Sequence, residues 1–157
     1  MSKPDHENTT FQDFERTIIY DIKDGDNPKL IKSMQRLRAI IESLPERHTI
    51  AMWLYDKVEE GPRFGMLYWP LNEDELPDPS LRPVTKDVHV TTKQYEDLSV
   101  ITCSCLTDVP DGDIVRLLSR ATEEIKKLHA KKLEDVSFSK VGFDDLFEKA
   151  ILKIYCI

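Results

Sequence analysis

The chain has 157 residues, of which 40% are hydrophobic and 32% are charged, and its net charge is −7. This length and composition predict one folded domain with an ordinary hydrophobic core and exclude a largely disordered chain. The negative charge argues against broad sequence-independent nucleic-acid binding, because neutralising phosphates needs a surplus of Lys and Arg on some face, although a local basic patch is compatible with it. We also expect no sequence-specific nucleic-acid binding.

The cysteines and the N-terminal residues indicate a compartment. Three cysteines, an odd number, and no apolar segment near the N-terminus fit a reducing environment without secretion. No run approaches the ~20 apolar residues that span a bilayer. We therefore expect a cytoplasmic location, which for a viral protein means the host cytoplasm or the virion.

The first predicted elements are a strand and a helix. Residues 1–10 are polar and lack periodicity, which predicts a flexible N-terminal tail ahead of a single domain over residues 11–157. Residues 17–23 have strand composition, and Asn27 and Pro28 fit a helix cap and a first helical position. The apolar positions that follow have helical spacing: Leu30, Met34, Leu37, Ile41 and Leu44.

A pair of strands and a loop follow. Residues 50–55 and 64–69 are apolar runs rich in aromatic residues, and the turn residues 59–62 between them predict a hairpin. Residues 70–86 hold four prolines among acidic residues, which predicts a long loop.

The second half predicts a hairpin and a second helix. Residues 88–92 and 99–106 alternate as strands do, and the polar residues 93–97 fit a turn between them. A helix is predicted over 113–132, because apolar residues recur with helical spacing and lysines gather near its end. Its stripe comprises Ile114, Leu117, Leu118, Ala121, Ile125 and Leu128.

The C-terminal region is ambiguous. Residues 136–139 fit a short strand, residues 143–154 begin with a helical stripe, and the last five residues are apolar enough for a closing strand. No fixed-period repeat is detectable. The order of elements predicts an α+β fold, with a mainly antiparallel sheet and two long amphipathic helices packed on it.

One cysteine cluster invites a metal hypothesis. If Thr92 pairs with Leu98 across the turn, His89 shares a face with Cys103 and Cys105, which places three soft ligands together. However, C-x-C is not the C-x-x-C knuckle of structural zinc, and no second ligand pair has zinc spacing. We therefore predict small core cysteines, with no metal and no cofactor.

Catalytic signatures are absent from the sequence. There is no G-x-S-x-G, no glycine-rich phosphate loop and no H-E-x-x-H, and five glycines offer little material for phosphate-cradling turns. We predict no catalytic residue.

The first predicted helix carries the best candidate surface site. Lys29, Lys32 and Arg36 fall on one helix face at i, i+3 and i+7, where a phosphate, an anionic membrane surface or an acidic partner would dock. Arg38 and Arg47 extend this set of anion-binding or partner-binding candidates. The alternative is an ordinary solvated face opposite the apolar stripe.

The proline-rich loop is a second candidate. Residues 76–83 could serve as an extended docking peptide, because proline-rich segments are preformed for groove binding. Its candidate contact residues are Pro77, Pro79, Leu81, Arg82 and Pro83.

The C-terminal run carries a family resemblance. Residues 143–151, Phe-Asp-Asp-Leu-Phe-Glu-Lys-Ala-Ile, with the apolar end that follows, resemble the C-terminal helix and strand of rhabdovirus matrix proteins of the vesicular stomatitis type. The order of the preceding elements is also similar. The resemblance implies a small non-enzymatic protein that self-associates, condenses a nucleocapsid and links it to a membrane.

These observations predict a non-enzymatic structural or interaction protein, with a viral matrix-like role as the sharpest form. Its expected partners are further copies of itself, a nucleocapsid protein or an anionic membrane surface. One alternative is a small-molecule binder or small enzyme with a pocket between the 88–106 hairpin and the 113–132 helix. Another is an adaptor that docks partners through the 76–83 loop.

Overall fold

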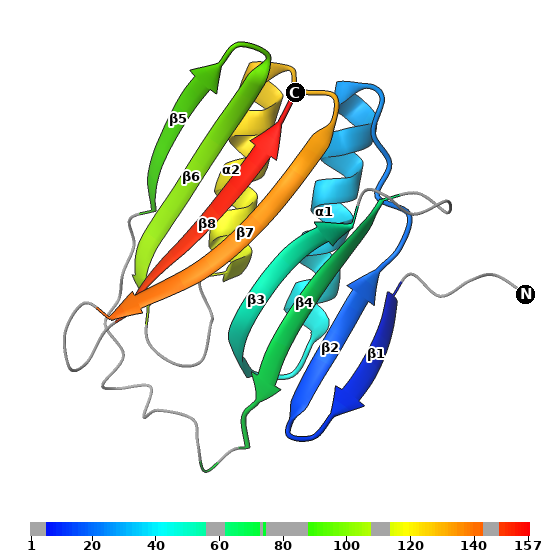
Figure 1. The fold of residues 1–157 in the computed structure, drawn as a ribbon, viewed down its shortest axis with the longest axis vertical. Coiled ribbons are helices and arrows are strands. Elements are labelled where there is room, and N and C mark those ends of the chain that lie inside the picture. Colours follow the sequence, from blue (N-terminus) through cyan, green and yellow to red (C-terminus); the bar gives the residue numbers. More distant parts are fainter. Residues whose placement is uncertain (1–5, 56–61, 73, 75–87, 108–113, 143–147) are drawn as a thin grey trace, which may run out of the picture.

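The computed structural model describes residues 6–55, 62–72, 74, 88–107, 114–142 and 148–157. Within these residues the chain forms eight strands and two helices (Figure 1). Their bounds are β1 His6–Phe11, β2 Phe14–Ile19, α1 Asn27–Ser43, β3 Arg47–Tyr55, β4 Arg63–Pro70, β5 His89–Tyr95, β6 Leu98–Thr107, α2 Ile114–Leu128, β7 Leu133–Gly142 and β8 Glu148–Cys156.

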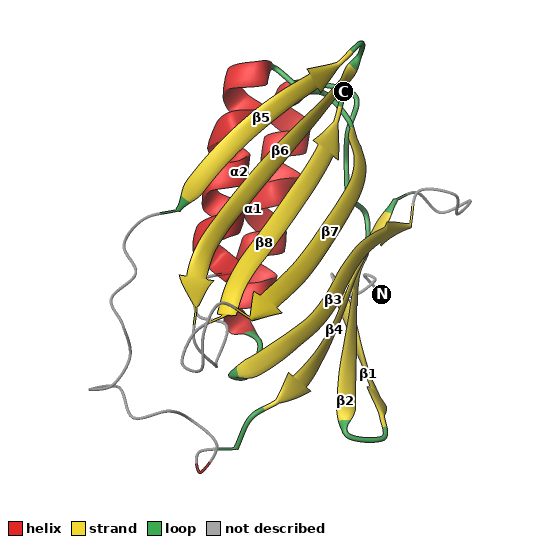
Figure 2. Ribbon diagram, turned by 60° about the vertical axis from the view of Figure 1, so that its left-hand side comes forward, coloured by secondary structure: helices red, strands yellow, loops and turns green. Residues whose placement is uncertain are grey.

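The strands form two antiparallel sheets of four strands each, with the orders β1-β2-β4-β3 and β5-β6-β8-β7. Figure 2 shows both helices on one side of the two sheets. Buried apolar residues from both sheets and both helices belong to one continuous cluster. The predicted α+β fold, with antiparallel pairing and two amphipathic helices, is confirmed, but the strands form two sheets where one was predicted.

The two halves of the chain have the same architecture. Each half runs strand, strand, helix, strand, strand, and each sheet places its four strands in the same order. The prediction of no repeat is therefore wrong at the level of structure: the chain contains two ββαββ units.

The strand registers of the two units match residue by residue. Equivalent residues lie 84 positions apart in the first three strands of each unit and 88 positions apart in the last. Each opposed pair of residues in the first unit has an equivalent pair in the second. His6–Ile19 corresponds to Val90–Cys103, Ile19–Phe64 corresponds to Cys103–Leu152, and Thr49–Tyr68 corresponds to Leu133–Cys156. The β-bulges match too, since β3 and β7 each lose register, at Ile50 and at Glu134.

The helices follow the same correspondence. Five buried positions of α1 and α2 are related by the 84-residue shift: Leu30 and Ile114, Ser33 and Leu117, Met34 and Leu118, Leu37 and Ala121, and Ile41 and Ile125. Only the last pair is identical. Buried position is therefore retained while side-chain size changes, which is why a search for repeated residues fails to find the units.

An approximate two-fold rotation relates the two units. It brings equivalent elements together, because α1 packs beside α2 and β3 lies beside β7 (Figure 1). β3 and β7 nevertheless belong to different sheets. Lys140 Nζ lies 3.3 Å from His48 Nδ1 across this junction.

The predicted tail was too long. Residues 6–10 belong to β1, which pairs with β2 along its whole length. This region lacks apolar alternation because β1 is an edge strand whose described side chains are largely exposed. Polar contacts support it instead: Thr17 Oγ1 donates to Asn8 Oδ1 (2.6 Å), and Thr10 Oγ1 donates to Glu15 Oε1 (2.7 Å).

The start of α1 differs by one residue from the prediction. The cap is Asp26, whose carboxylate accepts a hydrogen bond from the Lys29 amide (2.8 Å), and Pro28 is the second helical residue, one position later than predicted. Asn27 instead donates across the two-fold, from Nδ2 to the carbonyl oxygens of Ile125 (3.2 Å) and Ala130 (2.7 Å).

The predicted register of the 88–106 hairpin is wrong. Thr92 opposes Ile101, because the turn consists only of Glu96 and Asp97 and the strands extend into the predicted loop. This shift of three residues reverses the faces. His89 is exposed, whereas Cys103 is buried on the opposite face, so the geometry assumed for the metal hypothesis does not occur.

The chain ends in a strand. β8 covers Glu148–Cys156, and Ala150, Leu152, Ile154 and Cys156 alternate into the core. This settles the predicted ambiguity for these residues in favour of the strand. Residues 143–147, where the predicted helical stripe begins, lie outside the described residues.

Candidate functional site

A basic groove lies beside α1 and encloses about 330 Å³. Three of the five predicted anion-binding residues line it: Lys29, Lys32 and Arg36. The connector between β2 and α1 supplies Lys23 and Asp21, which the sequence reasoning missed. Periodicity could not find them, since the connector has no regular secondary structure.

Two side chains of α1 hold the connector in place. Ser33 Oγ accepts a hydrogen bond from the Lys23 amide (2.8 Å) and donates one to the Lys23 carbonyl oxygen (3.0 Å). Arg36 Nη2 donates to the carbonyl oxygens of Tyr20 and Asp21, each at 2.5 Å. Arg36 therefore forms part of the groove wall, with its guanidinium turned toward the backbone of the connector.

The lysines supply the exposed charge of the groove. Lys23 lies 3.9 Å from Asp21, and Lys29 lies 3.9 Å from Asp26. Exposed ion pairs at such distances contribute little and are screened by salt, so these lysines stay available to an anion. Lys32, also exposed, lies on the same lining. The groove is locally positive on a chain whose net charge is −7.

The other two predicted basic residues lie elsewhere. Arg38 lines a second groove, of about 300 Å³, between α1 and α2, where its Nη1 donates to Ser119 Oγ (3.2 Å). Arg47 is buried, and its Nη1 donates to the carbonyl oxygen of Pro45 (3.1 Å) just beyond α1. Arg47 thus satisfies backbone carbonyls at the helix end.

The alternative sites take different positions. The predicted docking residues Pro77, Pro79, Leu81, Arg82 and Pro83 lie outside the described residues. Between the 88–106 hairpin and α2, side chains from both elements are buried in the common core, among them Ile101, Cys103 and Leu118. The two grooves described above lie on other parts of the surface.

The three cysteines form no disulfide and are buried. Burial raises the pKa of the Cys103 thiol to about 12 and that of the Cys156 thiol to about 11. A thiol with so high a pKa carries almost no thiolate at neutral pH and is a poor nucleophile. Within the part of the chain that the structure describes, no group of three His, Cys, Asp or Glu side chains is arranged to hold a metal ion.

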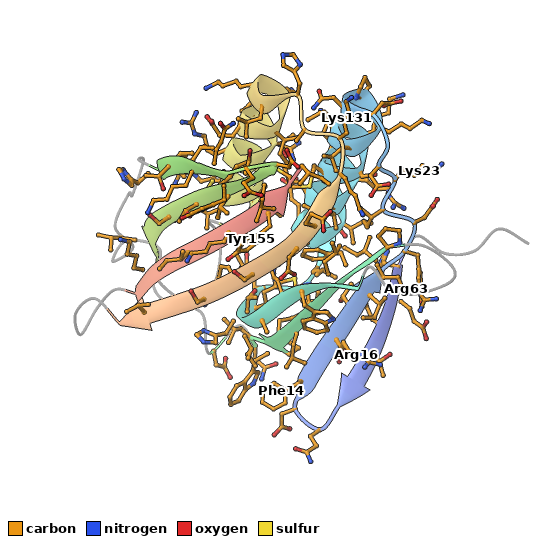
Figure 3. All side chains as sticks on the ribbon, turned by 45° about the horizontal axis from the view of Figure 1, so that its top comes forward. Phe14, Arg16, Lys23, Arg63, Lys131 and Tyr155 are labelled. Atoms are coloured by element: carbon orange, nitrogen blue, oxygen red, sulfur yellow. The ribbon has the colours of Figure 1, made fainter. Side chains whose placement is uncertain are left out.

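Figure 3 labels one residue of the groove, Lys23, together with residues of the first sheet. Lys23 is well separated from Phe14 and Arg16 on that sheet.

Comparison with protein-family models, with curated proteins and with solved structures finds no match. Neither α1 nor α2, the two helices within the described residues, is long and apolar enough to cross a membrane.

Proposed function

We propose that this chain is an interaction protein that docks an anionic membrane surface through the basic groove beside α1. The observation that carries the proposal is the convergence of Lys23, Lys29 and Lys32 on one groove. Their positions come from two segments that Ser33 and Arg36 fasten together.

The charge distribution determines how the molecule is oriented on the membrane. Each lysine near an anionic leaflet contributes about 1 kcal/mol of attraction, which salt screens within a Debye length. The chain as a whole is acidic, so the rest of its surface is repelled by the same leaflet. The molecule therefore binds with the groove turned toward the lipid headgroups.

The matrix-like form of the proposal adds self-association and a nucleocapsid partner. It is supported by the resemblance of residues 143–157 to rhabdovirus matrix proteins. Sedimentation velocity over a wide concentration range, at low and high salt, tests it. Reversible growth into larger species at low salt is expected, and a monomer under every condition contradicts the self-associating form.

A reducing cytoplasmic compartment belongs to the same proposal. Its support is that the three cysteines form no disulfide and are buried within the core.

Membrane docking is tested by co-sedimentation with vesicles of phosphatidylcholine, with and without phosphatidylserine. We expect binding only to the vesicles that contain phosphatidylserine, and weaker binding as salt rises. The triple variant Lys23→Glu, Lys29→Glu, Lys32→Glu should bind at least about 100-fold more weakly, since three attractions of about 1 kcal/mol each are lost and the new carboxylates add repulsion. Arg36 is left intact because it holds the connector.

The matched control reverses three lysines on the second sheet. Lys93, Lys149 and Lys153 are exposed on strands of that sheet, so replacing them by Glu makes the same change in net charge. Binding by this control should fall much less than binding by the groove variant. Equal losses in both variants, or no binding to phosphatidylserine vesicles by the original chain, reject the proposal.

A further inference from the structure

The approximate two-fold provides an internal comparison of the two sheets. The faces turned toward the helices are buried at equivalent positions, such as Ile19 and Cys103, or Phe64 and Leu152. Residues that differ in character between equivalent outer positions are not required by the fold itself. Those differences indicate what one sheet does that the other does not.

The outer face of the first sheet carries a row of rings. The row consists of Phe14 on β2, Trp69 on β4 and His48 on β3. His48 opposes Trp69 directly. Glu15 opposes Tyr68, so Phe14, one residue earlier on β2, lies beside Trp69, one residue later on β4. The rings of Phe14 and Trp69 meet edge to face, with centroids 5.7 Å apart. Trp69 is nevertheless 45% exposed.

A second aromatic group lies further along the same face. Trp53 opposes Gly65, and its ring lies against that glycine. Gly65 is four residues from Trp69, about 13 Å along a strand. Beyond it, the guanidinium of Arg63 lies over the ring of Tyr20, 4.9 Å from its centroid.

The second sheet lacks the tryptophans of this surface. At the equivalent positions, the second sheet has Leu98 for Phe14, Ile157 for Trp69, Ser137 for Trp53, Ser104 for Tyr20 and Ile151 for Arg63. It has Lys153 where the first sheet has Gly65. None of these equivalents is aromatic. The fold therefore forms without tryptophan on this face, where the second sheet presents Tyr95 and Tyr155 at the positions equivalent to Phe11 and Leu67.

Among the described strand residues of this face, two arginines lie beside one acidic residue, Glu7, whereas the chain as a whole is acidic. Arg16 is exposed on β2 between Phe14 and Ile18, and Arg63 adds a second guanidinium. The acidic Glu7 on the neighbouring strand accepts a hydrogen bond from Tyr20 Oη (2.5 Å). Rings beside guanidinium groups suit a partner that combines flat π systems with negative charge.

We propose that the outer face of the β1-β2-β4-β3 sheet binds single-stranded nucleic acid without sequence preference. Unpaired bases stack on Trp69 and Trp53, and Arg16 contacts the phosphates between them. A duplex hides the faces of its bases and cannot stack in this way. An open sheet face buries little of a small ligand, whereas a strand that follows it gains a contact from each successive base.

The chain carries its own reporter for this binding. Both of its tryptophans, Trp53 and Trp69, belong to this face. Titration with oligothymidylate at low salt should quench their fluorescence, and the anisotropy of a labelled oligothymidylate should rise in parallel. A duplex of equal length should give neither change, and salt should weaken the binding.

Two variants and two matched controls localise the site. Trp69→Ala should weaken oligothymidylate binding about 10-fold or more, and Arg16→Glu should weaken it and reduce its salt dependence. The controls are Ile157→Ala, at the position equivalent to Trp69, and Lys153→Glu, an exposed reversal on the second sheet. Both controls should bind as the original chain does.

The outcomes separate this inference from membrane docking. Oligothymidylate binding lost in the triple groove variant Lys23→Glu, Lys29→Glu, Lys32→Glu but kept in Trp69→Ala overturns the sheet site. Failure of the original chain to bind overturns it as well. So does sedimentation showing that Trp69→Ala only abolishes a dimer, since the face would then contact a second copy. Circular dichroism of Trp69→Ala excludes misfolding as the cause of any loss.

Discussion

The indole ring of Trp53 lies against the backbone of Gly65. A Cβ atom on residue 65 would be 2.2 Å from Cε2 of Trp53 and 2.4 Å from its Nε1. Gly65 is buried in β4, where it pairs with both β2 and β3. A glycine inside a strand usually weakens it, but here the missing side chain leaves room for the ring.

Gly65→Ala should therefore destabilise the chain by about 1–3 kcal/mol, because the ring must leave its position or β4 must shift. Urea unfolding measures the change. Gly142 at the end of β7 is the control, since a Cβ there would meet nothing within 4 Å. Gly142→Ala should stay within about 0.5 kcal/mol of the original chain. Equal stabilities of the two variants would contradict the packing argument.

Arg36 should affect stability where Lys32 does not. Replacing Arg36 with Gln removes the donor to the carbonyl oxygens of Tyr20 and Asp21 and releases the connector from α1. We expect a loss of about 1–2 kcal/mol in the free energy of unfolding. Lys32→Gln removes only an exposed charge and should change it by less than about 0.5 kcal/mol. The reverse order of effects would show that Arg36 does not hold the connector.

The elements that the sequence predicted well are those with a long apolar stripe or clear alternation. The helical spacing through Leu30, Met34 and Leu37 placed α1 to within a residue, because a stripe on one helix face needs no tertiary information. The polar strand β1 shows no apolar alternation, since it is an edge strand that pairs only with β2 and its described side chains are largely exposed. Its pairing with β2 is visible only in the folded structure.

The duplication was missed for a related reason. Equivalent turns read Phe-Gln-Asp-Phe at residues 11–14 and Tyr-Glu-Asp-Leu at residues 95–98, and Gln12 and Glu96 both have positive φ, at 55° and 53°. This similarity is a sequence signal, but four residues do not reveal a unit without the matching registers. The groove was predicted only on its α1 side, because the helix pattern carries no information about where Lys23 lies.

Asn27 should matter more than its position near the surface suggests. Its amide links the two units by donating to the carbonyl oxygens of Ile125 and Ala130, at 3.2 and 2.7 Å. Asn27→Asp places a carboxylate against these carbonyls and should cost about 1–3 kcal/mol of stability, more than Asn27→Ala.

The exposed amide of Gln94 on β5 provides the control for Asn27. Gln94→Ala should leave thermal unfolding nearly unchanged. If Asn27→Asp were as stable as the original chain in urea and heat denaturation, its amide would not couple the units.

The buried thiols predict an alkaline limit to stability. Burial raises the pKa of Cys103 from an ordinary value of 9.0 to about 12, so the folded chain keeps a proton that the unfolded chain releases above pH 9. The stabilising effect is complete below about pH 9 and is lost as the pH rises toward 12. The free energy of unfolding in urea should therefore fall across this range, and the slope should be smaller in Cys103→Ala. An unchanged slope in that variant would assign the alkaline loss to other groups.

At pH 8 the thiols should react with a disulfide reagent only after unfolding, and rapid reaction of the folded chain would contradict their burial.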